Sequence, residues 1–141
     1  MPAHRKLSGI NIQWPWTELL LSGRKTVETR SYPLPSKFKG VELAVIETPG
    51  PRGKRAAGIA KARVVGTIKF SGSYEYQNAK QWASEHHLHL VEASDVQFGF
   101  AQNKKKWAWT VECTLKFDQP VKAPSKRGIV FANNCLIPKS E

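Results

Sequence analysis

The run of residues from Trp107 to Phe117 limits the possible folds more than any other part of the chain. Apolar side chains occupy every second position along it, namely Trp107, Trp109, Val111, Cys113, Leu115 and Phe117. Side chains two apart in a strand share a face, so this period of two predicts a long strand with one face on a core. Trp109, in the middle of that face, is predicted to be buried.

Other strands and short helices are predicted on both sides of this run. Apolar or β-branched segments bounded by glycine and proline predict strands at residues 10–13, 25–32, 41–48, 58–70 and 129–131. Short helices are predicted at residues 17–22 and 77–89, while the basic segment 49–55 is expected to be a loop and Gly66 a bulge. About six strands with two or more short helices predict an α+β fold, in which the strands form a small closed or nearly closed β-barrel.

Length and charge restrict the organisation and the partners. The chain has 141 residues, so we expect one domain spanning residues 1–141. It carries 22 lysines and arginines against 11 acidic residues, a net charge of +11. Such a charge favours polyanionic partners, nucleic acid above all, although a basic surface without that role is the alternative.

The remaining composition concerns location and cofactors. No apolar run is long enough for a membrane span, and the first residues lack the apolar stretch of a secretory signal. Cys113 and Cys135 form no closely spaced pair. We therefore expect a reduced, cytoplasmic protein with no membrane association and no cofactor.

The segment from Gly23 to Arg30 concentrates chemically useful side chains directly after a predicted helix. Glu28 and Arg30 are two apart in a predicted strand, so they share a face with Thr26 and can pair. Lys25 points the other way unless the turn rotates it. A solvated strand face with a surface ion pair is the alternative to a functional cleft.

Gly23, Lys25, Glu28 and Arg30 fill the pattern Gly-x-Lys-x-x-Glu-x-Arg, and here the sequence resembles the ASCH family. The resemblance implies a PUA-like barrel that binds RNA, with a cleft lined by the strand that holds this pattern. Two activities are implied. Some ASCH proteins are ribonucleases acting on single strands, for which Lys25 and Glu28 would be the catalytic pair and Arg30 a phosphate ligand.

Other ASCH proteins are amidohydrolases that deacetylate N4-acetylcytidine with a lysine, a threonine three residues later and a distant glutamate. Lys25 matches the lysine, but Glu28 stands at the threonine position, and Thr26 or Thr29 could replace it only in a different register. The distant glutamate could be Glu85 or Glu92.

Aromatic and basic residues are interleaved at several places, the pattern expected where bases stack and cations follow phosphates. The candidate RNA-binding residues are Trp14, Trp16, Arg30, Ser31, Tyr32, Arg52, Lys54, Arg55, Lys69, Lys104 and Trp107, with further cations at Lys105, Lys106, Lys126 and Arg127. Core packing is the alternative for the tryptophans. His86, His87 and His89 are expected to be a solvated helix end and not a metal site.

Two functions follow as predictions. One is an RNA-binding protein that cleaves single-stranded RNA in the Lys25–Arg30 cleft, and the other is an amidohydrolase of a modified nucleoside such as N4-acetylcytidine. The partner is accordingly single-stranded RNA or a nucleotide-like small molecule. A protein-interaction adaptor is a third, structural alternative, and the sequence leaves open both catalysis and the oligomeric state.

Overall fold

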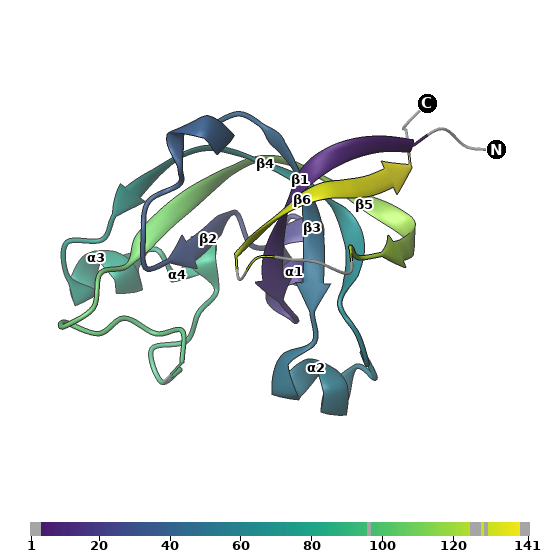
Figure 1. Ribbon diagram of the computed structural model, residues 1–141. Helices are drawn as coiled ribbons and strands as arrows, with labels where there is room; N and C mark the ends of the chain where they lie inside the picture. Colours follow the sequence, from purple (N-terminus) through teal and green to yellow (C-terminus); the bar gives the residue numbers. More distant parts are fainter. Residues whose placement is uncertain (1–3, 96, 125–127, 129, 139–141) are drawn as a thin grey trace.

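The computed structural model describes residues 4–95, 97–124, 128 and 130–138, which form one six-stranded sheet with short helices (Figure 1). In chain order the elements are β1 (His4–Gln13), α1 (Trp16–Leu21), β2 (Val27–Arg30), the 3-10 helix η1 (Ser36–Phe38), β3 (Glu42–Thr48), α2 (Gly50–Ala56), β4 (Arg63–Glu75), α3 (Ala79–Ser84), α4 (His86–His89), β5 (Trp107–Lys122) and β6 (Phe131–Pro138). The α+β prediction of about six strands and several short helices is confirmed.

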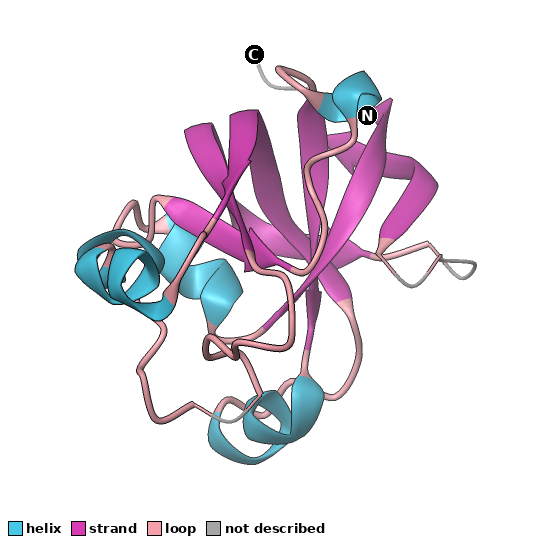
Figure 2. Cartoon of the chain, turned by 90° about the vertical axis from the view of Figure 1, so that its left-hand side faces the viewer, coloured by secondary structure: helices cyan, strands magenta, loops and turns pink. Residues whose placement is uncertain are grey.

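The strands lie in the order β2-β5-β4-β3-β1-β6, and only the β1–β3 pair is parallel. β3 pairs antiparallel with β4, the next strand along the chain. Figure 2 shows the strands as one curved layer, and α1 packs against β1, β4 and β5 of this layer. In the described part of the chain β2 and β6 remain the two edges, so the sheet is not closed, and the prediction of a barrel holds only for its curvature and strand number.

The alternation predicted along β5 fails halfway. Val111 pairs with Phe70 and Cys113 pairs with Lys69, so Glu112 is an extra residue on β5. One inserted residue reverses which side chains face inward. Trp109 is therefore fully buried as predicted, whereas Cys113 is exposed and Leu115 is 44% exposed.

Gly66 lies at another register shift, between β4 and both of its neighbours, as predicted. A Cβ atom at this position would collide with the carbonyl oxygen of Leu115 on β5. The absence of a side chain thus permits the close approach of these strands.

Several predicted boundaries were wrong. Most of the segment predicted as a loop at 49–55 is helix α2, because Pro49 precedes the helix and Pro51 lies in its first turn, where a proline removes no helical hydrogen bond. β1 starts at His4 and not at residue 10, β2 is shorter than predicted, and β4 begins at Arg63 and not at residue 58. Of the strand predicted at residues 129–131, Ile129 lies outside the described residues, and β6 continues to Pro138.

The helix predicted at residues 77–89 is two helices, α3 and α4, that meet at Glu85. Asn78 begins α3 by accepting a hydrogen bond from the backbone of Gln81 at 2.8 Å. Trp82 on α3 is buried, whereas the neighbouring Ala83 is exposed.

The larger core cluster surrounds Trp109, which is 0% exposed. Its ring meets Phe70 and Tyr32 edge-on at 5.4 and 5.6 Å, and its indole nitrogen donates to the carbonyl oxygen of Tyr32 at 3.0 Å. Because Tyr32 lies two residues after the end of β2, this contact fixes the end of that short edge strand.

Candidate functional site

A cavity of about 410 Å³ lies where the ends of β1 and β3 approach α1, β2 and the segment after α4. Lys25, Glu28 and Arg30 line it together with the aromatic rings of Trp16 and Phe98. The cavity therefore has a charged side contributed by the Gly23–Arg30 segment and an apolar side contributed by two other parts of the chain.

The turn between α1 and β2 directs Lys25 into this cavity. Gly23 has φ of +82°, a conformation that a glycine adopts without strain, and the backbone nitrogen of Lys25 donates to the carbonyl oxygen of Leu19 at 2.9 Å. Because β2 begins only at Val27, Lys25 does not follow the strand alternation. Its side chain thus reaches Glu28, while Thr26 is exposed and lies outside the cavity lining.

The Lys25 ammonium is almost completely enclosed, with its side chain 1% exposed. Nζ donates to the carbonyl oxygen of His89 at 2.5 Å, lies 3.8 Å from Oε1 of Glu28, and lies 4.9 Å from the centre of the Trp16 ring. Burial lowers the pKa of Lys25 to about 8; the Glu28 carboxylate opposes this change, and the charges of Arg30 and Lys106 add to it. A proton can therefore leave this amine near neutral pH.

Glu28 and Arg30 form the ion pair that their spacing predicts. The guanidinium donates from Nε and Nη2 to the same oxygen, Oε2 of Glu28, at 3.2 and 3.0 Å. Nη2 also donates to the backbone oxygen of Asn11 on β1 at 2.9 Å. Arg30 thus occupies one carboxylate oxygen and leaves Oε1 facing Lys25.

The carbonyl oxygen that holds Lys25 is itself fixed by the His89 side chain. Nε2 of the buried imidazole lies 2.8 Å from the carbonyl oxygen of Trp82, and Nδ1 accepts a hydrogen bond from the backbone nitrogen of Val91 at 2.9 Å. Burial lowers the pKa of His89, which favours this neutral imidazole with its proton on Nε2. The ring also stacks on Trp82 at 4.5 Å, so α3 and α4 are held together behind the site.

A second group of side chains attaches α3 and α4 to β4. The hydroxyls of Tyr74 and Tyr76 both donate to Oε1 of Glu85, at 2.5 and 2.7 Å. Burial, and then this hydrogen bond, raise the pKa of Tyr74 to about 12. Glu85 therefore holds the two tyrosine hydroxyls, and Glu92 is exposed beside His86. Neither of these glutamates, which were the two candidates for a catalytic role, lines the cavity.

Two further cations influence the cavity from its margins. The guanidinium carbon of Arg52 on α2 lies 5.7 Å from the centre of the Trp16 ring. Lys106 donates to the carbonyl oxygen of Phe98 at 2.8 Å, and its pKa is lowered by burial and raised in part by Glu28. Positive charge from α2 and from the segment before β5 thus approaches the same cavity.

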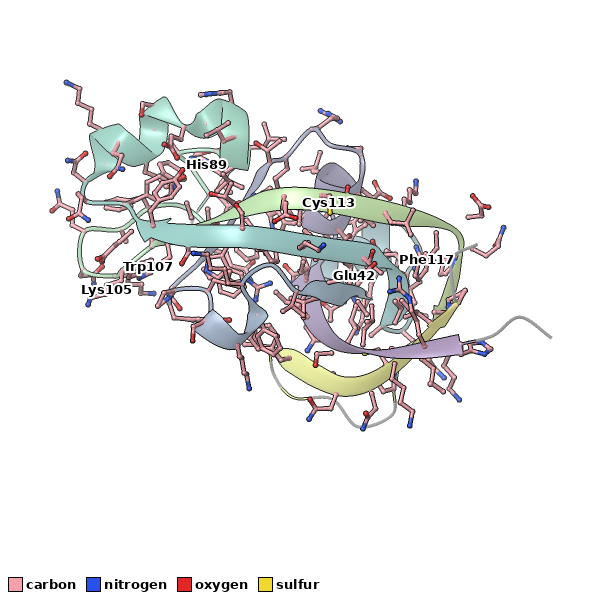
Figure 3. The ribbon with its side chains drawn as sticks, turned by 90° about the horizontal axis from the view of Figure 1, so that it is seen from above. Glu42, His89, Lys105, Trp107, Cys113 and Phe117 are labelled. Atoms are coloured by element: carbon pink, nitrogen blue, oxygen red, sulfur yellow. The ribbon has the colours of Figure 1, made fainter. Side chains whose placement is uncertain are left out.

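Of the residues predicted from the sequence, Trp16, Lys25, Glu28 and Arg30 line the cavity and Arg52 lies beside it. The other described candidates lie outside its lining: Trp14, Ser31, Tyr32, Lys54, Arg55, Lys69, Lys104 and Trp107. Trp107 is half-buried at the start of β5, near Lys105 and well away from Phe117, which lies farther along the same strand (Figure 3). Lys69 is paired with Glu112 at 3.9 Å, and Lys126 and Arg127 lie outside the described residues.

Sequence reasoning missed the parts of the cavity wall that come from other elements: Asn11, Gln13, Thr48, Val91, Gln97, Phe98 and Gly128. One local signal was available for Phe98. The Asp95 side chain accepts hydrogen bonds from the backbone nitrogens of Gln97 and Phe98, at 2.9 and 2.8 Å, in a turn typical of aspartate. An aromatic residue held in such a turn is a better candidate for a binding wall than one in an extended linker.

The three histidines of the segment 86–89 lie in different environments. His86 and His87 are exposed as predicted, but His89 is buried and uses both ring nitrogens within the protein. Among the described residues no group of three or more metal-ligating side chains occurs. Within the same residues no helix combines the length and apolar character needed to cross a membrane.

No protein-family model matches the chain, and no curated protein matches it either. Several solved structures, in contrast, do match the chain. An ASCH protein from Zymomonas mobilis is 16% identical with a TM-score of 0.61, over 82% of this chain and 72% of that one. A serine-to-alanine mutant of that protein gives 18% identity and a TM-score of 0.61, over 86% and 77% of the two chains.

A tyrosine-to-phenylalanine mutant of the same protein is 20% identical, with a TM-score of 0.54 over 82% of this chain and 73% of that one. All three alignments cover at least 82% of this chain, and identities of 20% or less support a shared fold alone. The chain described above has the ASCH fold.

Proposed function

We propose that this protein binds single-stranded RNA and takes one unpaired nucleotide into the cavity beside Lys25. The observation that carries the proposal is the Lys25 amine, which is buried in the cavity wall 3.8 Å from Glu28 with a pKa lowered to about 8. A volume of about 410 Å³ falls in the range of small-ligand sites. Trp16 and Phe98 offer apolar and aromatic surface for a base.

The charge around the cavity supports a ligand that carries phosphate. Lys25, Arg30, Arg52 and Lys106 contribute four positive charges when protonated, and Glu28 contributes one negative charge. The whole chain has a net charge of +11. An RNA strand whose base enters the cavity would bring its phosphates toward this excess of positive charge.

Lys25 also supplies a means of cleaving the bound strand. In its neutral form the amine can accept the proton of a ribose 2′-hydroxyl, whose oxygen then attacks the adjacent phosphorus while the bond from phosphorus to the 5′-oxygen breaks. The departing 5′-oxygen takes a proton from water, and the hydroxide that remains takes the proton from Lys25 and restores the neutral amine. Arg30 is positioned by Glu28 to stabilise negative charge on the phosphate. With a pKa of about 8, about one molecule in ten holds neutral Lys25 at pH 7.

A second activity, deacylation of a free modified nucleoside, is favoured by the volume of the cavity and by Thr29, which lines it. Neutral Lys25 would take a proton from an attacking water and return it to the departing amine, so that one residue completes the hydrolysis. Thr26, the other hydroxyl considered for this reaction, is exposed and outside the lining.

The test uses a labelled single-stranded RNA, the DNA of the same sequence, and N4-acetylcytidine. Each is incubated with the wild type, with Lys25→Met, and with Lys80→Met as a control at an exposed lysine on α3. We expect cleavage of the RNA but not of the DNA, which lacks the 2′-hydroxyl, and a loss of at least about a hundredfold in Lys25→Met alone. The rate should rise with pH and level off above a midpoint of about 8.

The outcomes separate the alternatives. Turnover of N4-acetylcytidine with intact RNA would replace cleavage by deacylation at the same cavity. RNA that binds without cleavage, and more weakly in Arg30→Gln, would leave a binding protein. Equal RNA binding by wild type and Arg30→Gln, together with no turnover of any substrate, would refute the proposal.

A further inference from the structure

A groove opens beside the cavity, at the end of the sheet where β1 and β3 finish. Its volume is about 500 Å³, and Thr48 lines both hollows. The register explains why they adjoin: Gln13, which lines the cavity, pairs with Thr48 at the ends of the parallel strands β1 and β3. The groove and the cavity are therefore neighbours across a single residue.

Three lysines from different elements line this groove. Lys54 lies on α2, Lys61 precedes β4, and Lys122 ends β5. They converge because β4 and β5 are paired at this end of the sheet, where Arg63 lies opposite Lys122. All three lysines are exposed, and their ammonium groups are thus accessible to a ligand.

No acidic side chain offsets these charges in the groove lining that the structure describes. The carboxylate nearest in register, Glu47, is only 2% exposed and is already engaged. It accepts a hydrogen bond from the hydroxyl of Thr17 and another from Nε of Arg63 at 2.9 Å. The groove consequently presents uncompensated positive charge next to the cavity.

We infer that this groove holds the phosphate backbone adjoining the nucleotide in the cavity. The inference rests on the proposed function. It gives the bound strand a path over the surface, from the cavity past Thr48 toward Lys61 and Lys122. Lysines on flexible stems suit this role, because successive phosphates need attraction and not a fixed geometry. Proteins that bind single strands without reading their sequence combine such a cationic groove with aromatic surfaces for bases.

The experiment compares two triple variants with the same loss of charge. The groove variant carries Lys54→Gln, Lys61→Gln and Lys122→Gln, and the control carries Lys6→Gln, Lys39→Gln and Lys80→Gln, three exposed lysines that line neither hollow. Affinity for a short single-stranded RNA is measured by fluorescence anisotropy between about 50 and 200 mM salt. Binding of cytidine, an uncharged probe of the cavity, is measured by calorimetry. Cytidine is a suitable probe because it carries no phosphate.

We expect the groove variant to lose about a hundredfold in RNA affinity near 0.1 M salt, and the slope of log affinity against log salt to become shallower by about 2, or about 0.7 per lysine. Cytidine binding should be unchanged, and the control should lose much less RNA affinity. An equal loss in both triple variants, or an unchanged slope in the groove variant, would overturn the inference while leaving the proposed function in place.

Failure of the proposed function would look different. The wild type itself would then bind neither cytidine nor the RNA. Lys61→Gln alone gives a milder variant should the triple change lower the stability of the fold, and it should make the slope shallower by about 0.7.

Discussion

Replacing Lys25 by methionine should change how stability depends on pH. Methionine keeps most of the volume of the lysine side chain but removes its ionisable amine. In the wild type the amine is 1% exposed, and burial lowers its pKa from 10.5 to about 8. The unfolded chain, where the amine is hydrated, keeps the ordinary value.

The magnitude follows from the two pKa values. Below pH 8 the amine is protonated in both states, and its burial destabilises the folded protein by about 3 kcal/mol. Between pH 8 and 10.5 the unfolded chain binds more protons than the folded protein, so the free energy of unfolding of the wild type rises with pH. Lys25→Met lacks this rise because it has no proton to release.

The assay is urea unfolding of both proteins from about pH 7 to about pH 10.5. Other lysines and the tyrosines titrate in both proteins and cancel when the two free energies are subtracted. The free energy of unfolding of Lys25→Met minus that of the wild type should fall by about 3 kcal/mol across this range, whatever its value at pH 7. Parallel curves would show that the Lys25 amine is not held in the environment described above.

Two further predictions concern the supporting structure. Thr17→Val should lower the free energy of unfolding by about 1–3 kcal/mol, because it leaves Oε2 of the buried Glu47 carboxylate without its donor while Arg63 still binds Oε1; urea unfolding measures this, and an unchanged midpoint would contradict it. A thiol reagent should modify Cys113 rapidly in the native protein and Cys135 only after unfolding; two fast-reacting thiols without denaturant would contradict the burial of Cys135.

The sequence was most informative where a local rule controls the outcome. Period-two alternation placed Trp109 in the core, and the two-residue spacing of Glu28 and Arg30 produced their ion pair. Both depend only on the geometry of a single strand. The same alternation failed beyond Val111, because the insertion at Glu112 depends on how β4 pairs with β5 and leaves no mark in the sequence of β5 alone.

The site was only partly predictable for a related reason. The charged residues of the site could be identified from the Gly23–Arg30 segment alone. The wall formed by Gln13, Thr48 and Phe98 could not, because these residues come from strands and turns distant in the chain. The burial that lowers the pKa of Lys25 likewise depends on Trp16 and on the carbonyl oxygen of His89, which only the folded chain brings together.

The open sheet has a consequence for how a ligand would affect the whole molecule. β2 is one edge, and β1 lies next to the other edge, so these strands share no ladder, and the Arg30 side chain bridges them by donating to the backbone oxygen of Asn11. The cavity takes its lining from both strands. A bound nucleotide would therefore fasten the first and last parts of the sheet to each other. At a nucleotide concentration of a hundred times the dissociation constant, binding would raise the free energy of unfolding by about 2.7 kcal/mol. The bound nucleotide would thus link two strands that share no backbone hydrogen bonds.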